Sequence, residues 1–440
     1  MELLEAEPKA KRKLGVFAIW AIGVGMVISG ESFGWNLGWA ITGPIWFFVP
    51  VMVAAVMYFS LVQNLIELAC VYPGLKGPHE YVEMAFGKWM GAFIAMAILF
   101  EFLFATPAIA SSLGEYLGFL VGDLAISPWI STLFLFAFSI VNLFDVHIGV
   151  RFLILLTLLA VVELLLYQGA IIDAFEFENL KNASFGSLDL IGFISAIPYA
   201  VWLFLAIEGI SLMSDSINPF NLRKNLTKGY NYAFFTLLIL ALLVLVLAAG
   251  GIDWALPESR AILSENHPMP ASIALILGKG HILVQIFTFI GLFGLIASLQ
   301  GIALAATTQL ESLLPKKINN KKGKRAIASL LVFLFSLLAI WTSQTGFLIE
   351  VSVFGAVCMY ILVSGSLLIL RRNRRAKVES LTTKEGYRHS EFNSTLSPLY
   401  AWVGIGISLI CIISFAYIQF QAFIIFLLCG IGYVFFLHKK

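Results

Sequence analysis

The sequence predicts an all-α integral membrane protein with twelve transmembrane helices. Of its 440 residues, 60% are hydrophobic and only 12% are charged, a balance that soluble domains of this length do not show. Stretches of about 20 apolar residues, the length needed to cross the hydrocarbon core, recur along nearly the whole chain with short polar connections. This pattern leaves no room for a separate soluble domain.

The first predicted span follows four basic residues and is expected to be retained, because the apolar run from Leu14 to about residue 38 has no small-residue cleavage pattern. Five spans form a first set within residues 14–172, five more form a second set within 189–370, and two further spans lie within 399–437. A cytoplasmic N-terminus (1–13) precedes them, and a polar cytoplasmic linker (371–398) separates the last two. Apolar windows place the spans at residues 14–38, 44–70, 90–120, 127–147, 151–172, 189–217, 230–250, 281–310, 326–342, 347–370, 399–418 and 420–437.

The positions of the lysine and arginine residues test this assignment of spans and of the side of the membrane on which each loop lies. With both termini on the cytoplasmic side, 25 of the 28 basic residues fall in cytoplasmic segments, and only Lys181, Arg260 and Lys279 do not. Cytoplasmic loops of membrane proteins carry such an excess, so we expect a multi-pass protein of a bacterial inner membrane. Residues 79–89 are expected to form a short amphipathic helix on the cytoplasmic face. The four cysteines lack any CxxC spacing, which indicates neither a metal site nor a disulfide framework.

Spans 1 and 6 contain sequences that interrupt a helix. Span 1 has several glycines around Glu31, and glycine has low helix propensity, so an unwound stretch is expected near Ser29 to Glu31. In span 6, Glu208 stands beside Gly209, with Pro198 ten residues upstream. Two broken helices at corresponding positions are typical of a five-plus-five inverted-repeat transporter with its site at the membrane midplane. The alternative is that these glycines only permit close helix packing.

The candidate buried acids Glu31, Glu101, Glu163 and Glu208 all lie within predicted spans, and no Lys, Arg or His lies deep in any span to pair with them. A charged residue at mid-membrane costs roughly 2.5–3.5 kcal/mol on insertion scales. Protonation of the carboxyl group, a bound cation or water must offset this cost. Glu163 is the weakest functional candidate, since a protonated carboxyl could simply bond to nearby backbone.

The missing basic partner also constrains the substrate. A carboxylate would be repelled by buried acids, whereas an ammonium group would supply the partner that they lack. A small cationic amine is therefore favoured. An amino acid stays open, because free N–H groups near Ser29 and Gly30 could hold its carboxylate.

Aromatic residues flank both expected breaks. Phe33 and Trp35 lie in span 1, and Tyr199, Trp202 and Phe204 lie in span 6. An aromatic lid would exclude water and attract an ammonium group through its ring faces, although most membrane aromatics only pack. The predicted gating residues are Phe33, Trp202 and Phe204, with Trp202 preferred because it lies about one and a half turns before Glu208.

Several segments resemble the amino acid–polyamine–organocation permeases, and within them the ethanolamine permease branch. VISGESFGWNLGW in span 1 is similar to that branch's ISGxxFGWN stretch, and ELACVYPGLKGPHEYVEMAFGKWMG is similar to the signature at the end of span 2. The likeness covers most of residues 15–375. It implies a LeuT-like fold with substrate held between broken spans 1 and 6, and it makes Trp202 and Glu208 similar to the occluding tryptophan and proton-linked glutamate of related exchangers. Thr307, Thr308 and Gln300 depart from the family pattern.

The resulting hypothesis is a secondary transporter, not an enzyme, that moves ethanolamine or a similar amine by alternating access. The transporter is expected to use no cofactor and to be coupled to H⁺ or Na⁺. The lipid bilayer is an expected partner and nucleic acid is not, and the oligomeric state is not predicted. An amino-acid permease of the same fold and a sensor that binds without transport are the alternatives. The predicted substrate-binding residues are Ser29, Gly30, Glu31, Glu101, Trp202, Glu208 and Gly209, and the ion-coupling residues are Glu208, Glu101 and Ser298.

Overall fold

A computed structural model describes residues 14–73, 75, 77–143, 150–187, 189–216, 221–315, 320–381 and 396–438. Within these ranges the chain is helical and contains no strand. Ten segments are long and apolar enough to cross a membrane, and a bent helix pair near the N-terminus would make an eleventh. Seven of the ten lie in single helices: α4 (Pro44–Val71), α6 (Lys88–Val121), α11 (Leu222–Gly251), α14 (Ile282–Leu313), α15 (Lys321–Ile340), α16 (Thr345–Leu381) and α17 (Ser397–Ile418). Two more extend α7 (Ser127–Leu143) and α8 (Val150–Ile171) by a turn of 3₁₀ helix, and the tenth runs from Leu190 to Ser211.

The bent pair corresponds to the first predicted span. It consists of α1 (Val16–Val27), the one-turn helix α2 (Ser29–Ser32) and α3 (Trp35–Thr42), with a 43° bend before α3. Phe33 is extended and Gly34 has φ +99°, a conformation that glycine adopts without steric cost. The expected unwound stretch at Ser29–Glu31 is therefore wrong in position, because these residues form α2 and the break follows them.

The second interrupted segment corresponds to predicted span 6. Helix α10 (Leu190–Trp202) ends in turns, Ala206 has φ +79°, and the 3₁₀ helix η3 (Ile207–Ser216) follows. Pro198 lies inside α10 and does not end it. The regular helix thus ends at Trp202, six residues before Glu208.

The C-terminal part differs from prediction in two respects. Helix α16 continues to Leu381, into the segment expected to be a polar linker, and residues 382–395 lie outside the described ranges. Helices α17 (Ser397–Ile418) and α18 (Phe420–His438) follow, but the apolar stretch of α18 is shorter than the spanning helices. The count of twelve spans therefore stays a prediction.

The connections contain short helices. Helix α5 (Pro78–Phe86) confirms that the 79–89 segment is helical, and it packs against α6 and α16. Two connections between predicted spans also contain short helices. The connection between predicted spans 5 and 6 contains η2 (Ile172–Ala174) and α9 (Phe177–Asn182). The connection between predicted spans 7 and 8 contains α12 (Pro257–Ala261), η5 (Ile262–Ser264) and α13 (Pro268–Leu277).

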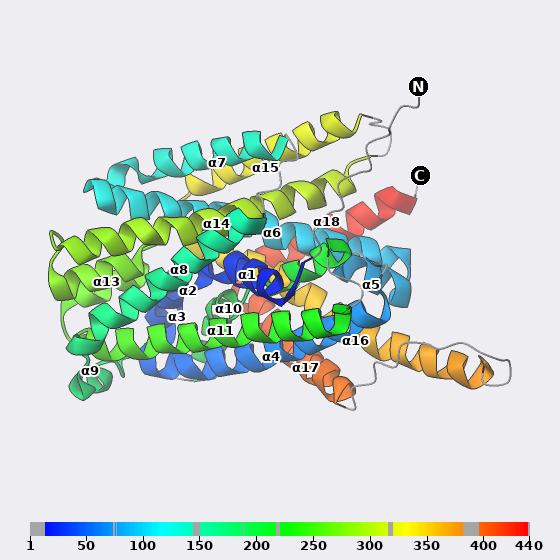
Figure 1. The fold of residues 1–440 in the computed structure, drawn as a ribbon, viewed down its shortest axis with the longest axis horizontal. Coiled ribbons are helices and arrows are strands. Elements are labelled where there is room, and N and C mark those ends of the chain that lie inside the picture. Colours follow the sequence, from blue (N-terminus) through cyan, green and yellow to red (C-terminus); the bar gives the residue numbers. More distant parts are fainter. Residues whose placement is uncertain are drawn as a thin grey trace, which may run out of the picture.

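The long helices run side by side as a bundle (Figure 1). Helix α6 packs on α14, α16 and α7, while α1 packs between α11 and α8 and also contacts η3. The interrupted segments thus lie inside the bundle, where neighbouring protein rather than lipid surrounds their irregular backbone, as membrane proteins require.

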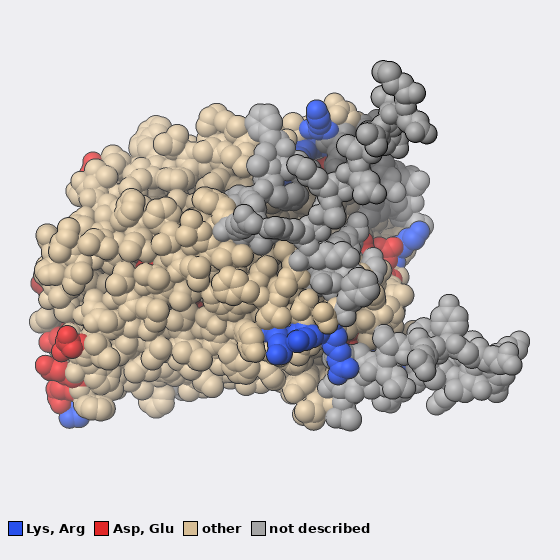
Figure 2. Space-filling view, viewed as in Figure 1, with Lys and Arg blue, Asp and Glu red and all other residues tan. Residues whose placement is uncertain are grey.

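Charged residues are distributed unevenly between the two ends of the bundle. On the face shown in Figure 2, most of the visible Lys and Arg lie toward the end where α5 and the end of α18 lie, whereas a cluster of Asp and Glu lies at the opposite end, near α9; a few charges of the other sign lie at each end. The predicted topology rests on the positions of the basic residues. Many of these, including those of segment 1–13, lie outside the described ranges. The multi-pass membrane architecture follows from the helices, and the assignment of a cytoplasmic side stays a prediction.

Candidate functional site

The two interruptions touch each other. A Cβ atom added to Gly30 would lie 2.6 Å from the carbonyl oxygen of Trp202 and 3.2 Å from the Cα atom of Leu203. The backbone of α2 therefore lies directly against the point where α10 ends. The sequence places residues 30 and 202 far apart, and only the fold brings the two irregular segments together.

Trp202 links the two interrupted segments. Its indole Nε1 donates a hydrogen bond of 3.2 Å to the carbonyl oxygen of Phe33, and the two rings meet edge to face with centroids 5.5 Å apart. A Cβ atom on Gly34 would lie 2.6 Å from the indole. Two predicted gating residues are thus in contact, and the indole fills space that the glycine leaves open.

The third predicted gating residue, Phe204, lies in a separate aromatic group. Its ring centroid is 5.5 Å from that of Tyr58 on α4 and 5.9 Å from that of Phe234 on α11. Tyr58 in turn shares a 2.9 Å hydrogen bond with Tyr360 on α16. Phe204 therefore packs against aromatic side chains of α4 and α11.

Glu101 and Glu208 form a buried pair of acids. Glu208 in η3 accepts a 3.2 Å hydrogen bond from the hydroxyl of Tyr360. The carboxyl group of Glu101 on α6 lies close enough to that of Glu208 for the two to interact electrostatically, while neither carboxyl oxygen of Glu101 has a hydrogen-bond partner. Both side chains are buried, and none of the ion pairs among the described residues involves either of them. Such a pair lacks a counter-charge and is suited to hold a proton or a small cation.

Close helix packing brings Glu101 to this position. A Cβ atom on Gly355 of α16 would lie 2.5 Å from the carbonyl oxygen of Ala97 and 2.7 Å from the backbone nitrogen of Glu101. Ser352, also on α16, donates a 2.7 Å hydrogen bond to the carbonyl oxygen of Glu101. Helices α6 and α16 therefore approach closely enough to direct Glu101 and Tyr360 at the same carboxyl group.

Glu31 does not join this pair. It is fully buried in α2, its two carboxyl oxygens have no hydrogen-bond partner, and no acid interacts with it among the described residues. Its backbone carbonyl oxygen accepts a 3.0 Å hydrogen bond from the indole of Trp35. The structure thus separates the two acids that the sequence places at the two breaks, and it pairs Glu208 with Glu101 instead.

Ser298 on α14 lies at the start of α2. Its hydroxyl donates a 2.8 Å hydrogen bond to the carbonyl oxygen of Gly25 and accepts a 3.4 Å hydrogen bond from the backbone N–H of Ser29. One hydroxyl thus satisfies backbone groups on both sides of the turn at Ile28. Gly209 lies against the end of the Met26 side chain, from which a Cβ atom on Gly209 would be 2.5 Å away.

Glu163 on α8 is also buried without a hydrogen-bond partner. Its carboxyl group lies against α14, where a Cβ atom on Gly291 would come within 2.4 Å of Oε1. The neighbouring Tyr116 interacts with it and donates a 3.3 Å hydrogen bond to the carbonyl oxygen of Ser32. This acid is close to the end of α2 and belongs to a different group from the Glu101 and Glu208 pair.

Three further buried or half-buried acids were missed from the sequence. Glu350 accepts hydrogen bonds from Tyr199 (2.7 Å) and Gln419 (2.6 Å). Glu67 pairs with Arg371 at 3.1 Å and Glu115 with His267 at 2.8 Å. All three lie inside predicted spans but within about five residues of a span end, where a polar side chain can reach the membrane interface, so the sequence did not mark them as buried.

Comparisons with known proteins agree with this architecture. The family profile described as "Amino acid permease" matches residues 14–436. A protein of Rhizobium meliloti (strain 1021) described as an uncharacterized transporter is 23% identical over 253 residues, which are 55% of this chain and 54% of that protein. The chain thus spans about half the length of this curated relative. Because the profile covers nearly the whole chain, including both interrupted segments and the buried acids, the protein belongs to the amino acid permease family.

Proposed function

We propose that the protein is a secondary transporter that moves a small amine, ethanolamine or a close relative, across the membrane by alternating access. The observation that carries the proposal is the buried pair of Glu101 and Glu208, which has no basic partner among the described residues and lies beside the second break. The family supports a membrane transporter of small molecules. The choice of an amine rests on the charge of the site.

The chemistry of the acid pair favours a cation. Two adjacent carboxyl groups in a low-dielectric interior do not both ionise unless a positive charge neutralises them. An ammonium group or a proton would serve, and Tyr360 already orients Glu208 through its hydroxyl. The ring of Tyr58 packs against those of Tyr360 and Phe204, and such rings would attract a cation through their faces.

The alternative amino-acid substrate has less support from the backbone. A substrate carboxylate would need free N–H groups at the broken helix, but the N–H of Ser29 bonds to Ser298 and that of Glu31 bonds to the carbonyl oxygen of Ile28 at 3.1 Å. These donors are already satisfied. An amine without a carboxylate avoids competing for them.

The burial of the whole site supports alternating access as the mechanism. Glu31, Glu101, Trp202 and Glu208 are all buried, so substrate would reach them only after a rearrangement. We place that movement where Gly30 and Trp202 meet, since the backbone on both sides is already irregular there. H⁺ or Na⁺ is the proposed coupling ion, with Glu101, Glu208 and Ser298 as the coupling residues.

Purified protein in liposomes tests the proposal. Uptake of labelled ethanolamine is expected to follow an imposed H⁺ or Na⁺ gradient, and excess unlabelled ethanolamine should compete more strongly than a zwitterionic amino acid. Glu208→Gln should reduce uptake more than the matched variant Glu163→Gln, because Glu163 lies outside the pair. Absence of amine-dependent flux would refute the proposal. Stronger competition by amino acids would establish the permease alternative, and tight binding without flux would establish a sensor.

A further inference from the structure

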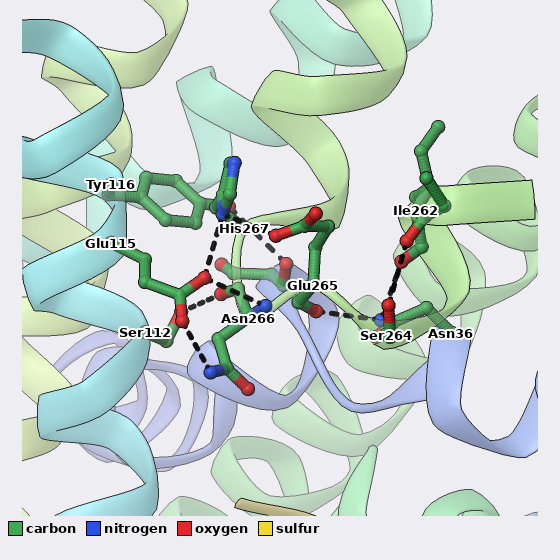
Figure 3. Close-up of polar contacts among 11 residues, drawn as sticks. Asn36, Ser112, Glu115, Tyr116, Ile262, Ser264, Glu265, Asn266 and His267 are labelled. Carbon is green, nitrogen blue, oxygen red and sulfur yellow. Dashed lines mark hydrogen bonds and ion pairs between the residues drawn. The ribbon is translucent and has the colours of Figure 1, made fainter. Parts of the chain in front are cut away.

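A second group of ionisable residues lies away from the buried acids, where the loop between η5 and α13 crosses α6 (Figure 3). Glu115 comes from α6, whereas Glu265 and His267 come from the loop. The loop lies near α13, at the end of the bundle opposite α18 (Figure 1). None of these three residues takes part in the site described above.

Their ligand atoms converge on a small volume. His267 Nδ1 lies 2.8 Å from Glu115 Oε2 and 3.6 Å from Glu265 Oε2, and all three atoms lie within 4.8 Å of one another. Ligands of a tetrahedral Zn²⁺ ion with bonds of about 2.1 Å are roughly 3.4 Å apart. Small side-chain movements would therefore suffice to surround such an ion, with water as the fourth ligand.

The group has an unbalanced negative charge. Two carboxyl groups face one imidazole nitrogen, and no Lys or Arg pairs with either acid among the described residues. Arg260, the basic residue of the same loop region, is occupied elsewhere: its Nε donates to the carbonyl oxygen of Trp254 at 3.1 Å and its guanidinium lies over the ring of Phe185. A cation would supply the missing charge.

Exposure allows an ion to enter. The His267 side chain is 4% exposed, but those of Glu115 and Glu265 are 23% and 36% exposed. The site is thus a buried imidazole behind two carboxylates that water reaches. Mixed nitrogen and carboxylate ligands suit Zn²⁺ better than Mg²⁺ or Ca²⁺, which prefer oxygen alone.

We propose that Glu115, Glu265 and His267 form a binding site for a divalent transition-metal cation of the zinc class. The ion would replace the hydrogen bond between His267 Nδ1 and Glu115 Oε2. Glu115 would keep its hold on the loop through Oε1, which accepts a 2.6 Å hydrogen bond from the side chain of Asn266.

The position of the site gives the ion a regulatory effect, an inference that rests on the proposed transport function. Asn36 on α3 donates hydrogen bonds to the carbonyl oxygens of Ile262 (3.0 Å) and Glu265 (2.8 Å). The same loop is held to α6 through Ser112, which donates to the carbonyl oxygen of Asn266 at 2.7 Å. A bound ion would strengthen the connection between α6, the loop and α3, and would therefore slow any movement of α3 that transport requires.

Thermal unfolding of the purified protein with added ZnCl₂ tests the metal site without reference to transport. Zinc should raise the melting temperature of the unaltered protein in a concentration-dependent way, and MgCl₂ should not. Glu265→Gln and His267→Ala should weaken zinc binding at least roughly tenfold, because each removes a ligand. Glu258→Gln, an exposed acid of α12, and His281→Ala, an exposed histidine outside the group, are the matched controls and should respond like the unaltered protein.

A zinc response that is absent from the unaltered protein, or that persists in both Glu265→Gln and His267→Ala, would overturn the metal site. Flux tests the regulatory effect separately: zinc should lower amine uptake in the unaltered protein and in Glu258→Gln, and not in Glu265→Gln. Uptake that zinc leaves unchanged in protein that binds zinc would refute the effect on transport. If no substrate flux were found at all, the proposed function would fail while the melting experiment would still decide the metal site.

Discussion

Replacing Gly30 by alanine tests whether the contact between the two interrupted segments supports the site. The added Cβ would lie 2.6 Å from the carbonyl oxygen of Trp202, whereas carbon and oxygen atoms ordinarily approach to about 3.3 Å. The two segments would have to separate by roughly 0.7 Å, and the obstacle is backbone that cannot rotate away. Overpacking of this kind costs about 1–3 kcal/mol.

A cost of about 1–3 kcal/mol corresponds to roughly 5–150-fold in an equilibrium constant. We expect Gly30→Ala to lower the melting temperature of the purified protein and to reduce amine uptake by a factor in this range. The matched control is Gly301→Ala on α14, where the added Cβ would meet the side chain of Met26 at an ordinary 3.6 Å. Alanine there gains helix propensity, so stability should stay level or rise. Equal melting temperatures and uptake in the two variants would refute the reasoning.

Three further predictions concern polar contacts. Ser298→Ala removes the hydroxyl that bonds to Gly25 and Ser29; unpaired buried backbone groups cost about 1–3 kcal/mol, so uptake and melting temperature should fall, and unchanged values would contradict this role. Asn36→Ala removes two hydrogen bonds to the η5–α13 loop, so a cysteine introduced in that loop should react faster with a thiol reagent, and an unchanged rate would argue against the connection. Glu163→Gln should leave the melting temperature nearly unchanged, since a neutral carboxyl and an amide are similar in size and charge; a large loss would indicate that Glu163 is ionised and paired.

Sequence patterns predicted the buried acids and the two irregular segments, but not which groups meet. The four acids stand out because each lies in an apolar stretch without a basic residue, and burial of all four agrees with that pattern. The break in span 1 was misplaced because glycine content indicates weak helix propensity over a whole stretch. The actual position depends on Gly34, whose positive φ leaves room for the indole of Trp202.

Apolar length and the absence of basic residues are properties of a local stretch of chain, so the sequence by itself determined the membrane-embedded helical class and the buried acids. Pairing is a property of helix packing, which glycines such as Gly355 make possible by close approach. Only the tertiary structure therefore decided that Glu208 meets Glu101 rather than Glu31. In the same way, it brought Glu115 and His267, which are distant in the sequence, to one group at the end of the bundle.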